Sequence, residues 1–199
     1  MIPRFYDATE GEVLVDGVPV RQIDLGALRS RVAFVMQKSE LFSDTVANNI
    51  RWGKEDATEE EIREAAQLAQ ASNFIEGFGA GYDTFIAEKG ASLSGGQKQR
   101  ISIARALVRK PQILILDDAT SALDLATEAK LRRGLHEALR DTTVIMIAQR
   151  IASVKDADRI AVIENGTIRH CAPHEELMQI SETYRDIYQS QMQNGGGVA

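Results

Sequence analysis

The sequence predicts an α/β protein built on a mixed sheet, with a helical section in its middle. Three short apolar runs, Gln112–Leu116, Thr143–Ala148 and Arg159–Ile163, alternate with polar stretches of helical character. Buried strands that alternate with helices are typical of a parallel sheet. Two helix start signals lie between residues 58 and 97, and a hairpin signal lies toward each end of the chain.

The hairpin signals are Asp16–Gly17 and Asn165–Gly166. Both dipeptides favour the left-handed backbone of a tight two-residue turn. The first separates Gly11–Val15 from Val18–Val20, so we expect an N-terminal β-hairpin.

A short helix and a strand are expected next. Asp24 can cap a helix that runs through Ser30, because an aspartate there accepts a hydrogen bond from the first turn. The apolar run Val32–Met36 then predicts a buried strand that ends at Gln37.

The middle of the chain is predicted to be helical. Thr58 and Glu61 have the spacing of a capping box, which marks a helix start. Three glycines between residues 77 and 81 indicate a loop. Ser94 can cap a further helix whose apolar positions include Ile101 and Leu107.

The composition argues against several classes of protein. The net charge of 23 − 29 = −6 argues against a nucleic-acid partner. The longest apolar runs, Ile113–Leu116 and Val144–Ala148, are too short to span a bilayer, so we expect any membrane link to come through a partner. Cys171 is the only cysteine, which favours a reducing compartment.

An acidic pair, Asp117–Asp118, follows the apolar run Ile113–Leu116. Carboxylates at the carboxyl end of a buried strand lie where α/β proteins bind ligands. Asp117 is suited to holding Mg²⁺ directly or through a bridging water. The alternative interpretation is a buried strand followed by an ordinary turn.

A second chemical signal is Leu93-Ser94-Gly95-Gly96-Gln97, which precedes a basic helix. The two glycines let a ligand approach the backbone closely. Ser94 offers a hydroxyl, and the helix start offers N–H groups and the positive end of the helix dipole. This pattern favours a phosphate site, and the alternative is an ordinary capped helix after a loop.

In order and spacing, these signals and Ser121-Ala122-Leu123-Asp124 resemble the signature motif, Walker B strand and D-loop of the ABC ATPase family. Gln37 resembles the family's Q-loop glutamine. The resemblance covers nearly the whole chain and implies the ABC-type P-loop NTPase fold. It implies a partial ATPase domain at 1–192, comprising the Q-loop and helical subdomain (about 38–110), the Walker B core (111–172) and C-terminal helices (173–192), and then a flexible tail at 193–199.

The resemblance also implies ATP and Mg²⁺ as ligands. Gln37 and Asp117 would hold the metal. Asp118 and Gln149 would occupy the catalytic positions. The nucleotide would contact Gln37, Ser94, Gly95, Gly96, Gln97 and Asp124.

Three features depart from the family pattern. The GxxxxGK[ST] phosphate loop and its strand are absent from these residues, so we expect an N-terminally truncated domain that is inactive and aggregation-prone by itself. Asp118 replaces the usual glutamate, and a displacement of about 1 Å can cost roughly a hundredfold in rate. Gln149 replaces the usual histidine and exchanges no proton near neutral pH. The two replacements favour the degenerate-site subunit of a heterodimeric multidrug or lipid exporter.

Two segments resemble exporters within the family. Phe85–Gly90 resembles the X-loop, with Ala87 in place of a glycine, and Leu41–Ile50 resembles the segment after the Q-loop. The resemblance implies two partners, an exporter's transmembrane domain and a second ABC ATPase domain, at the cytoplasmic face of the cell membrane. Phe42 and Trp52 could instead be core aromatics. A non-enzymatic regulatory subunit and a soluble ABC ATPase outside transport remain alternatives.

Overall fold

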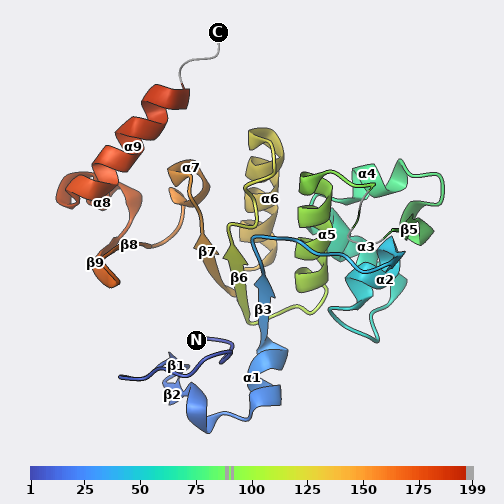
Figure 1. Ribbon diagram of the computed structural model, residues 1–199, viewed down its shortest axis with the longest axis horizontal. Coiled ribbons are helices and arrows are strands. Elements are labelled where there is room, and N and C mark those ends of the chain that lie inside the picture. Colours follow the sequence, from blue (N-terminus) through green and yellow to red (C-terminus); the bar gives the residue numbers. More distant parts are fainter. Residues whose placement is uncertain (88–89, 91, 196–199) are drawn as a thin grey trace. The chain divides into compact units, whose positions relative to one another are not determined.

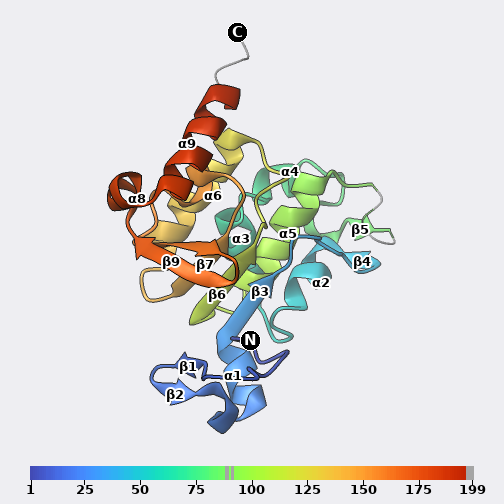
Figure 2. The same cartoon turned by 60° about the vertical axis from the view of Figure 1, so that its left-hand side comes forward.

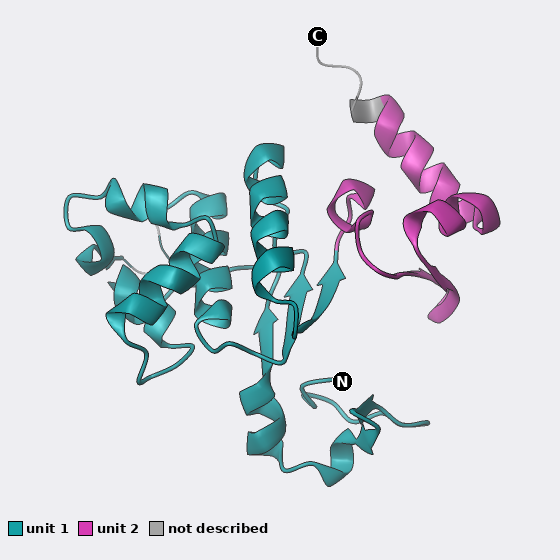
Figure 3. Ribbon diagram, turned by 180° about the vertical axis from the view of Figure 1, so that it is seen from behind, with its two compact units in different colours: residues 1–147 teal, residues 148–199 magenta. Residues whose placement is uncertain are grey.

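The computed structural model describes residues 1–87, 90 and 92–195, in two compact units. Figure 3 shows them as Met1–Ile147 and Ala148–Ala199. The boundaries predicted at 110/111 and 172/173 are not tested by this division and stay predictions. Residues Glu88 and Lys89 of the X-loop-like segment, and residues 196–199 of the predicted tail, lie outside the described part.

A three-stranded parallel sheet forms the centre of the first unit (Figure 1). Its order is β3 (Val32–Val35), β6 (Ile113–Asp117) and β7 (Thr143–Ile147). Val35 pairs with Leu116, and Leu116 with Met146, so the three strands end at one edge. The alternating apolar runs therefore form strands as predicted at these three places.

The N-terminal elements confirm the predicted hairpin and capped helix. Strand β1 (Leu14–Val15) pairs with β2 (Val18–Pro19) across Asp16 and Gly17, whose φ angles are +51° and +77°. A short 3-10 helix, η1 (Val20–Gln22), follows in place of further strand. Helix α1 (Leu25–Arg31) then begins where the Asp24 side chain accepts a hydrogen bond from the backbone N–H of Ala27.

The middle section is largely helical, as expected, and the Thr58–Glu61 capping box is present. Its helix α5 (Gly95–Leu107) packs against both α2 (Val46–Arg51) and α3 (Glu59–Leu68) (Figure 1 and Figure 2). A Cβ atom on Gly53 would lie 1.9 Å from the carbonyl oxygen of Arg105, so only glycine allows this approach of α2 to α5. The elements are β4 (Asp44–Thr45), α2 (Val46–Arg51), α3 (Glu59–Leu68), α4 (Ser72–Glu76), η2 (Gly81–Asp83), β5 (Phe85–Ile86) and α5 (Gly95–Leu107).

Both faces of the sheet carry packed side chains. Leu114 and Leu116 belong to the main core, together with residues of α5 and with Leu131 and Leu135 of α6 (Leu125–Ala138). Ile115 points into a second cluster with Leu28 of α1. The sheet therefore lies between the helices and the N-terminal elements, which fixes the positions of its strand ends.

The second unit has its own small core around Leu177 and Tyr184. The hydroxyl of buried Tyr184 lies 2.8 Å from Nδ1 of His174. Burial raises the pKa of the Tyr184 phenol. The elements are α7 (Ile151–Val154), β8 (Ile160–Glu164), β9 (Thr167–Ala172), α8 (His174–Ile180) and α9 (Glu182–Gly195).

Two expectations need correction in this unit. The run Arg159–Ile163 was expected to join the parallel sheet, but in the described chain β8 pairs antiparallel with β9 across the Asn165–Gly166 turn. The two-residue turn explains the difference, because it joins antiparallel neighbours. Helix α9 continues to Gly195, beyond the expected helix end at residue 192. In the described residues, no helix is both long and apolar enough to cross a bilayer.

Candidate functional site

The acidic pair lies at the carboxyl end of the central strand. Asp117 is the last residue of β6, and Asp118 follows with a φ of +48°. The backbone N–H of Asp118 donates to the carbonyl of Ile147, which keeps the pair beside the end of β7. Asp118 is 8% exposed, so its carboxylate requires polar partners.

Gln37 supplies one of those partners. It follows β3, which is the parallel neighbour of β6, so both chain segments emerge at one sheet edge. Its Nε2 donates to Oδ2 of Asp118 at 3.0 Å. The structure thus brings together Gln37 and Asp118, which are 81 residues apart in the sequence.

This edge suits a magnesium ion that is also held by phosphates. Mg²⁺ is commonly bound through one or two protein oxygens together with substrate phosphates. Asp117 and the amide oxygen of Gln37 could provide such atoms. The described residues contain no group of three or more His, Cys, Asp or Glu side chains arranged to hold a metal, so a self-contained protein cage is not built here.

The Ser94 motif forms the first turn of α5. The Ser94 hydroxyl accepts from the backbone N–H of Gln97 at 3.3 Å, and the Ser94 N–H donates to the Gln97 side-chain oxygen at 2.9 Å. This reciprocal capping box confirms the predicted helix start. The N–H groups of Gly95 and Gly96 have no acceptor within the helix, and they offer an anion the donors that the motif predicts.

Asp124 caps the next helix, α6. Its carboxylate accepts from the backbone N–H of Thr127 at 2.9 Å and from the Thr127 hydroxyl at 2.7 Å. The hydroxyl bond is the main reason that the pKa of Asp124 lies below its ordinary value. Asp124 is therefore a helix cap, and its predicted contact with a nucleotide stays a prediction.

Gln149 lies in the second unit, just after β7. Its backbone oxygen accepts from Nε2 of Gln191 on α9 at 2.7 Å, and the Gln191 side-chain oxygen accepts from the Ile151 N–H at 2.8 Å. One side chain thus holds the backbone on both sides of Arg150. The predicted catalytic position of Gln149 stays a prediction.

Sequence reasoning missed two buried polar residues beside these motifs, Gln99 and Glu128. Gln99 is 4% exposed, and Glu128 is 5% exposed and accepts from the hydroxyl of Thr120. Helical spacing could have found both. Gln99 lies four residues before Ile103, and Glu128 lies three residues before Leu131, so each is on the buried face of its helix.

An exposed aromatic pair lies on the helical section. Phe42 and Trp52 stack with ring centres 4.4 Å apart and are 45% and 64% exposed, so they are not core residues. The guanidinium of Arg105 lies over the Phe42 ring at 5.0 Å. The backbone near Phe42 is held by Asn49, whose Nδ2 donates to the Phe42 carbonyl at 3.0 Å.

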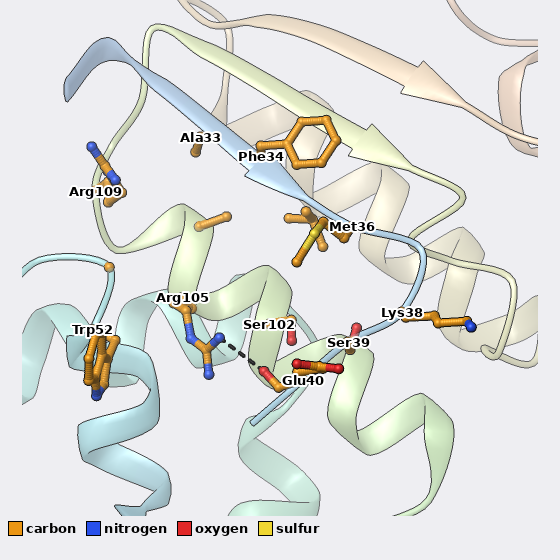
Figure 4. Close-up of a pocket in the computed structure, with 13 residues that line it drawn as sticks. Ala33, Phe34, Met36, Lys38, Ser39, Glu40, Trp52, Ser102, Arg105 and Arg109 are labelled. Atoms are coloured by element: carbon orange, nitrogen blue, oxygen red, sulfur yellow. Dashed lines mark hydrogen bonds between the residues drawn. The ribbon is translucent and has the colours of Figure 1, made fainter. Parts of the chain in front are cut away.

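A small cavity of about 160 Å³ adjoins Trp52 (Figure 4). It lies between the end of β3 and α5, and Arg105 crosses it to donate to the carbonyl of Glu40. The hydroxyls of Ser39 and Ser102 line it and are buried, without hydrogen-bond partners in the described residues. Exposed aromatic side chains are enriched at protein interfaces.

Comparisons with known proteins identify the kind of chain to which this geometry belongs. The sequence model of a family described as ABC transporter matches residues 1–121. A protein of Bacillus subtilis (strain 168), named as a candidate multidrug export ATP-binding/permease protein, YgaD, is 46% identical over 194 residues. That alignment covers 98% of this chain and 33% of the relative.

Two further comparisons agree. The ATP-dependent lipid A-core flippase of Desulfotalea psychrophila (strain LSv54 / DSM 12343) is 46% identical over 191 residues, covering 96% of this chain and 33% of the flippase. A solved structure of a bacterial Atm1-family ABC exporter with ATP bound matches with a TM-score of 0.92 and 37% identity, over 96% of this chain and 34% of that one. The chain therefore spans about a third of the length of these relatives, and the predicted α/β fold of ABC exporter nucleotide-binding domains is confirmed.

Proposed function

The chain belongs to the ABC transporter family, and from that premise we propose that it is the ATP-binding and hydrolysing part of an exporter. In this proposal ATP binding and hydrolysis drive the export of a multidrug- or lipid-type substrate. The relatives named above are an export ATP-binding/permease protein and a lipid flippase, and they motivate the substrate classes. The observation that carries the proposal is the meeting of Gln37 with Asp118 at the end of β6, beside Asp117.

The proposed site is shared between two ATPase domains. Ser94, Gly95 and Gly96 would contact the phosphates of a nucleotide bound mainly by a second domain, because the first N–H groups of α5 have no acceptor within the helix and favour an anion. Gln37 and Asp117 would hold Mg²⁺ in this domain's own site. When bound, Mg²⁺ neutralises charge on the β- and γ-phosphates. Asp118 would then orient the attacking water.

We further propose an asymmetric, heterodimeric arrangement. Asp118 has a shorter side chain than the glutamate usual in the family, and its carboxylate accepts a hydrogen bond from Gln37. Gln149 has no titratable proton. Both features support a site that hydrolyses ATP weakly, while the intact Ser94 motif completes a competent site with the partner.

The Phe42–Trp52 pair is the proposed contact with the exporter's transmembrane domain. Exposed aromatic side chains are enriched at protein interfaces. The Arg105 guanidinium packs against the Phe42 ring and holds this pair in position. The chain would thereby be held at the cytoplasmic face of the cell membrane through its partner.

A complete exporter that carries this sequence as one of its two ATPase domains provides the test. Ser94→Ala should remove most steady-state ATPase activity, because it disables the competent shared site. Asp118→Asn should change turnover less than about twofold, since a carboxylate in a weak site contributes little to the total. Equal losses from the two substitutions would contradict the asymmetric arrangement.

A nucleotide-binding assay separates this proposal from a purely regulatory role. We expect the 199 residues alone to bind ATP weakly and not to hydrolyse it, because they contain no GxxxxGK[ST] loop. Restored hydrolysis in the complete exporter would favour the enzyme. Nucleotide binding without hydrolysis in the complete assembly would favour the regulatory alternative.

A further inference from the structure

Gln99 is a polar side chain on a buried helix face. It is 4% exposed and shares the inward face of α5 with Ile103 and Leu107. A buried amide is costly unless its oxygen and its nitrogen both find partners. Both ends of the Gln99 amide point to the loop after β6: Oε1 accepts from the Ala122 N–H at 3.0 Å, and Nε2 lies 3.4 Å from the Ser121 hydroxyl oxygen.

The glycines at the start of α5 bring this loop into close contact. A Cβ atom on Gly96 would lie 2.9 Å from the carbonyl oxygen of Ala122, and a Cβ on Gly95 would lie 3.4 Å from the Ala122 Cβ. Any side chain at position 96 would therefore push the loop away from the helix. The two glycines thus serve the packing of α5 on the loop as well as the predicted approach of a phosphate.

The loop is also fixed at its other attachments. The Ser121 hydroxyl donates to the carbonyl of Asp118 at 2.9 Å, next to the carboxylate that binds Gln37. The hydroxyl of Thr120 donates to buried Glu128 of α6 at 2.9 Å. Residues 118–124, termed here the acidic loop, are consequently held by α5 on one side and by α6 on the other.

We propose that Gln99 is a positioning residue that locks the acidic loop onto the signature helix α5. Its two hydrogen bonds keep Asp124 and Ser94 at a fixed separation, so a second ATPase domain meets them as one surface. Gln99 itself contacts no nucleotide in this arrangement. The inference rests on the proposed function for its effect on ATP hydrolysis, whereas the lock itself is a property of the folded chain.

The experiment compares Gln99→Met and Gln99→Glu in the complete exporter. Methionine keeps the length of the side chain but removes both hydrogen bonds. Glutamate keeps an acceptor for the Ala122 N–H, and because burial favours the protonated carboxyl group, its O–H can still donate toward Ser121. Hydrogen exchange of a peptide covering residues 119–124 should accelerate about tenfold in Gln99→Met and less in Gln99→Glu, as expected for the loss of one or two buried hydrogen bonds. Exchange of residues 101–107 within α5 should stay unchanged, which shows that the helix remains folded.

ATP hydrolysis provides the second readout. The kcat of Gln99→Met should fall by about ten- to a hundredfold, the effect expected when a shared site is misaligned by up to 1 Å. The KM for ATP should change less than about twofold, because the groups that bind ATP are intact. A purely structural role would lower the amount of folded protein and leave the kcat of the folded fraction unaltered.

The outcomes separate this inference from the proposed function. If the hydrogen-exchange rate of residues 119–124 is unchanged in Gln99→Met, Gln99 does not hold the acidic loop. If hydrogen exchange at residues 119–124 is faster in Gln99→Met while kcat is unchanged, Gln99 holds the loop but has no role in ATP hydrolysis. Failure of the proposed function would appear earlier and independently, as an unaltered exporter without ATPase activity or as full activity in Ser94→Ala, and the exchange measurement would still decide whether Gln99 holds the loop.

Discussion

Strands β6 and β7 are neighbours in the same sheet and both are apolar, yet they differ sharply in burial. Leu114 in β6 is fully buried, whereas Val144, its direct partner in β7, is 38% exposed. Leu116 in β6 is also fully buried, whereas Ile147 at the end of β7 is 48% exposed. Strand β6 pairs with a strand on each side, while β7 pairs only with β6 in the described residues.

The difference shows that an apolar sequence identifies a strand but does not predict how much of its surface is buried in the folded chain. A central strand is covered by its neighbours and by the helices packed on the sheet. An apolar strand at the edge keeps unpaired backbone groups and exposed side chains, a surface on which further chain can pair. The segments that follow the two strands also differ in the burial of the side chains that hold them. Buried Gln99 and Glu128 hold the acidic loop after β6, whereas the partly buried Gln191 holds the Gln149 segment after β7.

The largest expected effect contrasts the paired residues Leu114 and Val144. Leu114→Ala should lower the free energy of unfolding by about 2–5 kcal/mol, because it leaves a cavity in the main core. Val144→Ala should cost less than about 1 kcal/mol. Urea denaturation of the dilute chain, followed by far-ultraviolet circular dichroism, measures both. Equal losses would mean that Val144 is buried in solution and that the contrast is wrong.

An intermediate effect is expected at Gln191. Gln191→Leu removes the two hydrogen bonds that the Gln191 side chain makes to the backbone at Gln149 and Ile151, which should destabilise the second unit locally by about 1–2 kcal/mol. The exchange rate of the Ile151 amide hydrogen reports this loss. Gln189→Leu, an exposed position on the same helix, is the matched control. If both variants exchange alike, Gln191 does not hold this segment.

The smallest expected effect on stability concerns the edge itself. Val144→Lys should change the free energy of unfolding by no more than about 1 kcal/mol, because the side chain can extend into solvent. It should nevertheless slow aggregation of the 199-residue chain, since a charge on an edge strand opposes pairing with other chains. Light scattering at matched concentration compares it with the unaltered chain. Faster aggregation would show that the β7 edge is not the site of self-association.

Local chemistry made much of the fold predictable. The Asp16–Gly17 turn and the caps at Asp24, Thr58 and Ser94 all form as expected, because each signal acts within three or four residues. The short elements α2, α4, β4 and β5 were not predicted, since they have at most six residues and rely on tertiary packing. The prediction that β8 joins the parallel sheet was wrong, because an apolar run alone does not specify the strand with which it pairs.

The candidate site was predictable in part. The motif types led to Asp117, Asp118 and the Ser94 turn, but the hydrogen bond between Gln37 and Asp118 depends on the pairing of β3 with β6. Gln99 and Glu128 were overlooked because single polar residues in helices usually face solvent. Only the periodicity of their apolar neighbours indicates that they are buried.

The left-handed backbone at Asp118 has a consequence for protein engineering. Aspartate is among the few residues other than glycine that adopt a positive φ readily, since its short side chain can hydrogen-bond locally. Lengthening it to glutamate would add reach and would place at this φ a residue that adopts it less readily. Asp118→Glu would therefore extend the carboxylate toward the water but strain the backbone at residue 118. A second substitution that relieves this backbone strain would be needed beside it.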